Sequence, residues 1–176
     1  ELEAKAFRKI LRTLKSNFDH VLIDAPAGIE RSLRGLLSNE INECVLVCTP
    51  DDVCIRNAER TASVLRKKGL TAQRVIVNRR NPDYIRRGEM YAAQTVALTL
   101  DMPLLGEIPE DAEIYRALLH HQSVMEGESE GRNAIARIAL RMTTDEDVPL
   151  PEYGQKRTLF QRLFQRRRKG DEKHVR

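Results

Sequence analysis

The 176-residue chain is long enough for one domain, and its 41% hydrophobic and 32% charged residues exclude an intrinsically disordered protein. No apolar run approaches the roughly 20 residues that a membrane-spanning helix needs. The net charge is +4, but residues 155–169 alone carry seven Lys or Arg and no acid. Subtracting those seven leaves −3 for the rest, so a basic surface over the whole protein is excluded.

The first residues have a helical period, because Leu2, Ala6, Ile10 and Leu14 recur on one face. The sequence begins directly in this helical pattern and without an initiator Met. We therefore expect the chain to be a piece of a longer protein.

Four short and nearly continuous apolar runs follow, as expected of strands buried on both faces of a parallel sheet. They span residues 20–25, 44–49, 74–78 and 104–108. Helical stretches are predicted at residues 30–38, 53–68, 88–100, 112–121 and 132–142. This alternation predicts an α/β fold with a mostly parallel sheet flanked by helices.

The chain divides into four parts by composition. Residues 1–142 form the α/β domain, and residues 143–154 read as a linker because they hold prolines and acids without periodicity. Residues 155–170 are expected to form a basic amphipathic helix, and residues 171–176 a polar tail.

The three cysteines, Cys44, Cys48 and Cys54, lack metal-ligand spacing, and we expect them to be buried reduced thiols.

The first apolar run ends in an acid, in the arrangement called Walker B, Val21-Leu22-Ile23-Asp24. A carboxylate at a strand tip orients Mg²⁺ beside a nucleotide, usually through the ion's water shell. The alternative is an acid that only ends a strand or caps a helix. Gly28, four positions later, permits close approach of the main chain to a phosphate, and such an amide can sense a γ-phosphate.

Three motifs give the chain a recognisable resemblance. Residues 24–30 read D-A-P-A-G-I-E and resemble the D-x-P-A-G-I-E signature of the MinD proteins, division-site ATPases of the ParA/MinD group with a deviant Walker A motif. Asn81-Pro82 with residues 87–90 resembles the N-P…R-G-[DE]-M stretch of the family, and residues 106–111 resemble its G-x-I-P-E-D. The similarity covers residues 17–124.

The resemblance implies a P-loop NTPase fold that binds ATP and Mg²⁺. Asp24 would be the Walker B acid, which contacts the metal indirectly through water, and Gly28 would face the γ-phosphate. Asn78 and Arg79, at the end of the third apolar run, match the position that contacts adenine; the alternative for Asn78 is a turn residue.

The last of the three motifs would border the base. Pro109, Glu110 and Asp111 match a loop that contacts the base largely through its main chain. Structural alternatives stay open here: Pro109 could only end a strand, and Asp111 could cap the helix that begins at Ala112.

The phosphate loop of the family, K-G-G-x-G-K-[ST], does not occur in the sequence. In the family its strand lies beside the Walker B strand, so we expect the flank of residues 21–24 to be unpaired and the fold to be truncated at its N-terminus. We predict that these 176 residues alone bind ATP poorly.

The basic segment has the pattern of a helix that lies in a membrane interface. Leu159, Phe160, Leu163 and Phe164 would share one face, and cations such as Arg162 and Arg166 would meet anionic lipid. Two alternatives are a final helix docked on the domain and a nucleic-acid-binding arm; the apolar face argues against the latter.

The sequence therefore predicts part of an ATP-dependent, membrane-associating ATPase that positions the division septum. Its expected partners are an anionic membrane surface, a second copy in an ATP-dependent homodimer and MinC/MinE-like regulators, without nucleic acid. Its expected location is the cytoplasm, peripherally on the inner face of the cell membrane. The alternatives are a ParA-type partition or cargo-positioning ATPase and a non-hydrolysing membrane adaptor.

Overall fold

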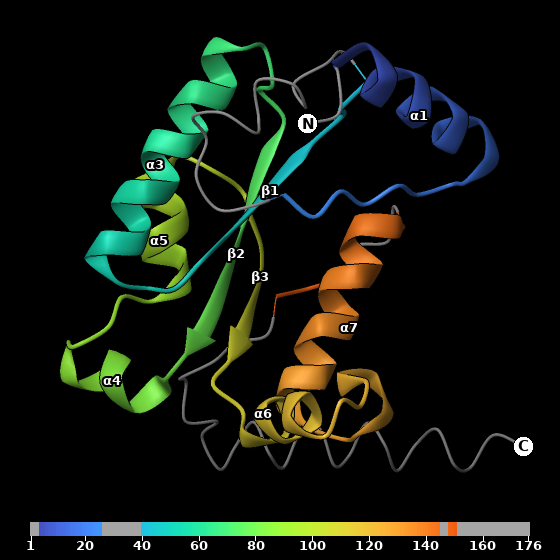
Figure 1. Cartoon of the computed structure of the whole chain (residues 1–176). Helices are drawn as coiled ribbons and strands as arrows, with labels where there is room; N and C mark the ends of the chain where they lie inside the picture. The colour runs from blue at the N-terminus through green and yellow to red at the C-terminus, as the bar shows by residue number, and fades with distance from the viewer. Residues whose placement is uncertain (1–3, 26–39, 145–147, 151–176) are drawn as a thin grey trace, which may run out of the picture.

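The computed structural model describes residues 4–25, 40–144 and 148–150. Its centre is a parallel sheet in the order β1-β2-β3 (Figure 1). The strands are β1 (Cys44–Cys48), β2 (Gln73–Arg80) and β3 (Leu104–Pro109). The predicted α/β class with a parallel sheet is confirmed.

Helices cover both faces of this sheet. In Figure 1, α3 (Asp52–Lys67) and α5 (Ala93–Leu100) lie on one side and α7 (Glu130–Thr143) on the other. The remaining elements are α1 (Ala4–Asn17), α4 (Pro82–Arg87), α6 (Ala112–Leu119) and the short 3₁₀ helix η1 (Val124–Glu126).

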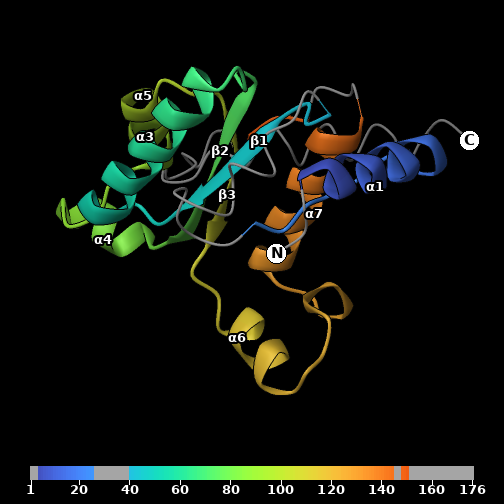
Figure 2. The same ribbon diagram turned by 45° about the horizontal axis from the view of Figure 1, so that its top comes forward.

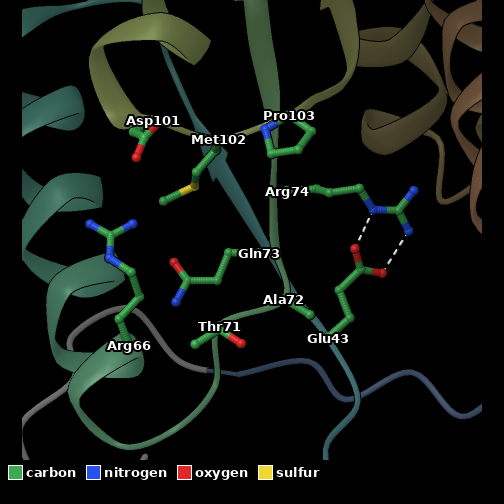
Figure 3. Close-up of a pocket in the computed structure, with 9 residues that line it drawn as sticks. All are labelled: Glu43, Arg66, Thr71, Ala72, Gln73, Arg74, Asp101, Met102 and Pro103. Atoms are coloured by element: carbon green, nitrogen blue, oxygen red, sulfur yellow. Dashed lines mark hydrogen bonds and ion pairs between the residues drawn. The ribbon is translucent and has the colours of Figure 1, made fainter.

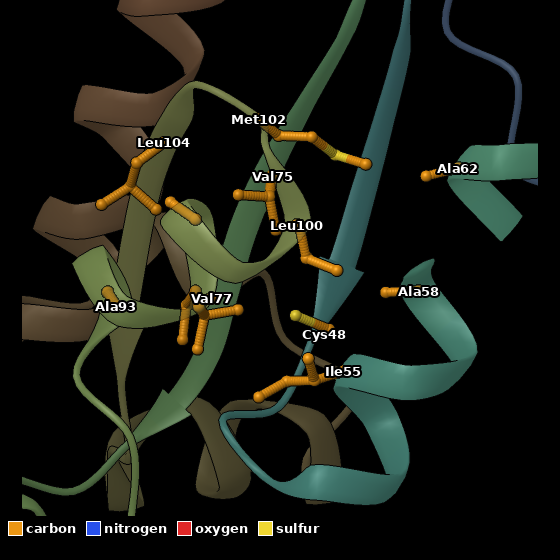
Figure 4. Packing of buried hydrophobic residues seen from close by; sticks show 12 residues of the cluster. Cys48, Ile55, Ala58, Ala62, Val75, Val77, Ala93, Leu100, Met102 and Leu104 are labelled. Atoms are coloured by element: carbon orange, nitrogen blue, oxygen red, sulfur yellow. The ribbon is translucent and has the colours of Figure 1, made fainter. Parts of the chain in front are cut away.

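The core is built on β2, whose side chains alternate between the two faces. Val75 and Val77 are fully buried against α3 and α5, in a cluster that includes Leu100 (Figure 4). Ile76 points the other way and packs with Ile138 of α7. The expected pattern of strands buried on both faces is therefore correct for β2.

The close approach of α7 to the sheet depends on a glycine in β3. A Cβ on Gly106 would overlap the side chain of Ile138. Because no side chain projects there, α7 rests directly on the strand, and the carboxyl end of β3 is held in a fixed place.

The prediction of a strand at residues 20–25 is wrong in this structure. The segment has no regular secondary structure, and among the described residues it pairs with no strand. Figure 1 shows it running from α1 back toward β1. Leu22 is 81% exposed. An apolar run without a ladder partner gains neither the hydrogen bonds nor the burial that stabilise a strand.

Two helix predictions also need correction. The helix expected at residues 88–100 begins only at Ala93, as α5. Residues 82–87 form a separate helix, α4, which was not predicted and which ends at Gly88, where the backbone is left-handed with φ 75°. In α1 the buried residue is Leu11, whereas Ile10 is 47% exposed. The predicted helix at residues 30–38 lies outside the described residues.

Candidate functional site

The carboxyl ends of the strands meet at the lower edge of the sheet in Figure 1, where open α/β sheets bind ligands. At the end of β2 the pairing skips from Val77↔Glu107 to Arg80↔Pro109, so β2 holds one extra residue there. Arg79 lies in this bulge with φ 59°, and its side chain is exposed. A left-handed non-glycine residue in a bulge costs free energy and marks a functional candidate.

Hydrogen bonds hold the ends of β2 and β3 together. The N–H of Glu110 donates to the carbonyl of Arg80 at 2.9 Å, and the amide Nδ2 of Asn81 donates to Oε2 of Glu110 at 3.0 Å. Asn81 Oδ1 also accepts from the N–H of Asp83 at 2.9 Å and caps α4. The predicted N-P and I-P-E-D motifs therefore lie side by side.

A buried ion pair stiffens the same strand pair. Arg80 Nε lies 3.2 Å from Glu107 Oε2, and the two side chains are only 7% and 11% exposed. Burial raises the pKa of Glu107, although the positive charge of Arg80 opposes the shift. The pair lies inside the sheet rather than on the edge, so we assign it a structural role.

Asp111 joins α6 to α7. Its Oδ1 accepts from the N–H of Glu113 at 2.8 Å, and its Oδ2 accepts from the N–H of Gly131 at 2.7 Å. Burial by itself would raise the pKa of Asp111, but hydrogen bonds from the Ser129 hydroxyl and from these amides lower it further than burial raises it. The prediction that Asp111 caps the helix at Ala112 is confirmed.

The end of β1 has a cap of the same kind. Asp51 accepts from the N–H of Cys54 at 2.9 Å and begins α3. The Thr49 hydroxyl donates to the same carboxylate, and this bond is the main reason that the pKa of Asp51 is lowered. The side chain is therefore an ionised cap beside the edge.

The predicted site residues divide into three groups. Asn78, Arg79, Pro109, Glu110 and Asp111 all lie at the joined ends of β2 and β3.

Asp24, the expected metal-orienting acid, is exposed in the segment that does not form a strand. Gly28 lies outside the described residues, as do Leu159, Phe160, Arg162, Leu163, Phe164 and Arg166 of the basic segment.

A cavity lies at the opposite edge of the sheet. It has a volume of about 430 Å³ and is lined by the amino end of β2, by the residues just before β1, β2 and β3, and by Arg66 of α3 (Figure 3). Gln73 points into this region and Glu43 pairs with Arg74 on its wall. This cavity lies away from the predicted nucleotide-binding residues, so it does not support a ligand cleft at the carboxyl edge.

Sequence reasoning missed the Arg80–Glu107 pair and the Asn81–Glu110 bond. Each joins residues far apart in the sequence, so no local pattern reveals it. One signal was available: Asn81 followed by Pro82 is a typical helix start, with a capping side chain and Pro at the first position.

The expectation of buried reduced thiols holds in full for Cys48, whereas Cys44 and Cys54 are only half-buried. All three are free, and burial is the main cause that raises the pKa of Cys48 to about 12. None of the helices in the described part of the chain is long and apolar enough to cross a bilayer.

Comparison with known proteins gives consistent relatives, although no family model matches. The septum site-determining protein MinD of Helicobacter pylori is 31% identical over 161 residues, which is 88% of this chain and 59% of that protein. The protein of the same name from Synechocystis is 30% identical over 113 residues, 64% of this chain and 42% of the relative. The chain thus spans less than two thirds of these relatives.

Solved structures show the same likeness. MinD of Aquifex aeolicus superposes with a TM-score of 0.79 at 25% identity, over 85% of this chain and 64% of that one. MinD of Pyrococcus horikoshii, solved with Mg-ADP, gives a TM-score of 0.65 at 30% identity, over 82% and 57%. A MinC:MinD complex from Aquifex aeolicus matches at 26% identity with a TM-score of 0.79, over 87% and 63%. By sequence and by fold, this chain is MinD-like over most of its length.

Proposed function

We propose that this chain is part of an ATP-dependent, membrane-associating ATPase that positions the division septum. The observation that carries the proposal is the joined end of β2 and β3, where two motifs shared with MinD proteins lie side by side. The similarity to septum site-determining proteins over 88% of the chain supports it.

The residues at this edge suit the base of a nucleotide. Asn78 and Arg79 would contact adenine, with Pro109, Glu110 and Asp111 along its border. The bulge supports this assignment, because it leaves the Arg79 side chain exposed at the strand end beside Pro109.

Asp24 would orient Mg²⁺ through water, and the Gly28 amide would face the γ-phosphate. The metal would neutralise phosphate charge when bound. The chain as printed has no K-G-G-x-G-K-[ST] loop, so a phosphate cradle would have to come from elsewhere in the native protein. A relative solved with Mg-ADP supports this choice of ligand.

The basic segment would bind the membrane through the apolar residues Leu159, Phe160, Leu163 and Phe164, with Arg162 and Arg166 near anionic headgroups. One copy binds weakly, and two copies in an ATP-bound homodimer bind better through multivalency. The protein would then sit peripherally on the inner face of the cell membrane. A MinC-like regulator is a further proposed partner, supported by the MinC:MinD neighbour, and a MinE-like one follows only from the resemblance.

Calorimetric titration with Mg-ATP tests the nucleotide part. The 176-residue chain should show no micromolar binding, whereas the full product of the gene should bind. In that full product, Arg79→Gly should weaken binding about tenfold by removing a charged contact. The fold should survive, because glycine adopts the left-handed conformation without strain.

Arg60→Ala serves as the matched control, since Arg60 is an exposed cation on α3. An unchanged affinity of the Arg79→Gly variant for Mg-ATP would show that Arg79 does not contact the nucleotide. Micromolar, Mg²⁺-dependent binding by the 176-residue chain would overturn the view that a further phosphate loop is required.

Flotation with vesicles tests the membrane part. Phe160→Glu should abolish binding to vesicles that contain anionic lipid. A purely phosphate-driven contact with nucleic acid would barely change, so equal retention on DNA by both forms would favour a partition-type ATPase instead.

A second candidate is a non-hydrolysing membrane adaptor, favoured by the absence of the phosphate loop from this sequence. The adaptor would float with vesicles equally well with and without ATP, whereas the ATPase would float better with ATP.

A further inference from the structure

Helix α6 turns an apolar face to solvent. Tyr115, Leu118 and Leu119 are 65%, 63% and 59% exposed, and their spacing of three and four residues places them on one side of the helix. A neighbouring side of the helix is packed, because Ile114 lies against Gly131 at the start of α7. Figure 2 shows α6 projecting away from the sheet together with the turn that follows it.

The surroundings of this face are acidic. Residues 110–130, which form α6 and the segments on either side of it, contain six Asp or Glu, one Arg, two His and no Lys. That arginine, Arg116, already pairs with Glu113 at 2.6 Å. Glu126 and Glu128 in the following turn are exposed, and within the described residues neither forms an ion pair. We call Tyr115, Leu118, Leu119, Glu126 and Glu128 the α6 surface.

We propose that the basic amphipathic segment of the same chain, residues 155–169, docks on the α6 surface. The two are chemical complements. The segment offers Leu159, Phe160, Leu163 and Phe164 with seven cations and no acid, and the α6 surface offers exposed apolar side chains together with the carboxylates of Glu126 and Glu128. Exposed apolar patches rimmed by charge mark interaction sites, and charge complementarity selects the partner.

The chain is long enough to make this contact. Leu150, the last described residue, packs against the core cluster on the sheet and lines the same small cavity as Ala134 of α7. Gly131, less than one helical turn before Ala134, is hydrogen-bonded to Asp111 at the start of α6. Residues 151–158 span at most about 28 Å when extended, several times the helical pitch of about 5.4 Å. The apolar residues of the segment therefore reach α6 without any movement of the domain.

Docking on the α6 surface would regulate the binding of the basic segment to the membrane. The four apolar side chains cannot face α6 and lipid at once, so α6 competes with the membrane for them and lowers the apparent affinity for vesicles. This consequence rests on the proposed membrane function, whereas the contact itself does not.

Hydrogen exchange of the 176-residue chain tests the contact. In the variant with Phe160→Ser and Phe164→Ser, the amides of α6 should exchange at least about threefold faster than in the wild type. The amides of α5 serve as an internal control and should not change. Protection of α6 in the wild type should decrease with salt, because the contact is partly ionic.

Flotation with anionic vesicles tests the competition. Leu118→Ser should raise the apparent vesicle affinity about threefold, and Glu126→Gln with Glu128→Gln should act in the same direction. Leu98→Ser is the matched control: Leu98 is 81% exposed on α5, away from the α6 surface, and its substitution should leave vesicle binding unchanged.

Equal exchange of α6 in the wild type and in the Phe160→Ser/Phe164→Ser variant would overturn the proposal. Protection that grows with protein concentration would also overturn it, because a second copy would then be the occupant. If the wild type and the Leu118→Ser variant both fail to float, the membrane function fails, and hydrogen exchange still decides the contact.

Discussion

Two regions of the molecule have similar apolar sequences, but one forms a buried strand and the other is an exposed segment without regular secondary structure. Residues 20–25 and the centre of β2 are both short apolar runs, yet Val75 and Val77 are fully buried whereas Leu22 is 81% exposed. The difference is the neighbour: β2 is paired on both sides, by β1 and β3. Apolar composition therefore does not suffice for a strand without a ladder on at least one side.

The β2–β3 pair is also fixed by several contacts at once. It has a backbone ladder, a buried ion pair, a side-chain bond between Asn81 and Glu110, and α7 packed on Gly106. Substitutions there should cost much more free energy of unfolding than substitutions in residues 20–25, and four experiments test this contrast.

The largest effect is expected for Glu107→Ala. It leaves Arg80 buried without its carboxylate, which should lower the free energy of unfolding by about 3–5 kcal/mol, as measured by urea denaturation. The pKa of Glu107 is raised in the folded state, so its ionisation costs stability as pH rises from the unfolded value of about 4.3. Glu107→Gln should remove that pH dependence. A loss below about 1 kcal/mol for Glu107→Ala would show that the pair is not buried in solution.

Gly106→Ala should have the next largest effect. The added Cβ would overlap Ile138, and overpacking of this kind costs about 1–3 kcal/mol. Gly127→Ala is the matched control, because nothing lies within 4 Å of a Cβ at that position. Equal urea midpoints for the two variants would contradict the close packing of α7 on β3.

Asp111→Ala should cost about 1–2 kcal/mol through the lost cap of α6, together with the lost tie to Gly131. Asp51→Ala removes the cap of α3 and a hydrogen bond from Thr49 two residues away, but no contact with a second helix, so it should cost less. The pKa of Asp111 is lowered by folding, so its contribution is present above the unfolded value of about 3.9 and is lost as pH falls through the folded value. Thermal unfolding between pH 6 and pH 2 measures this, and Asp111→Asn should show a shallower decline.

Leu22→Ser should have the smallest effect, within about 0.5 kcal/mol, because the side chain is exposed. Leu98→Ser provides an equally exposed comparison on α5. A loss above about 1 kcal/mol for Leu22→Ser alone would show that residues 20–25 are buried or paired in solution, and the contrast with β2 would disappear.

Much of the fold could be predicted from local patterns. The runs at residues 44–49, 74–78 and 104–108 were correctly predicted as parallel strands, and Asp111 as a helix cap, because burial periodicity and capping chemistry are properties of neighbouring residues. Gly88 shows how such a pattern fails. The predicted helix at residues 88–100 starts at this glycine, which in the structure ends α4 instead. The face of α1 was misjudged because tertiary contacts decide which side is buried.

The candidate site could be predicted only in part. Asn78 and Glu110 were predicted as site residues from the family resemblance, and the structure brings the ends of their strands together. The bulge at Arg79 could not be predicted, since it arises from the register of β2 on β3. The roles of Asp24 and Gly28, the domain boundaries and the membrane contacts of the basic segment stay predictions.

The sequence by itself determined the family resemblance, the three described strands and the separation of a basic amphipathic segment from an acidic domain, because each depends on residue identity and short spacing. Only the tertiary structure decided that residues 20–25 stay outside the sheet, that Arg80 and Glu107 pair inside it, and that α6 exposes an apolar face. These features depend on which segments meet in space, and hydrogen bonding, burial and charge pairing act only between groups that are in contact.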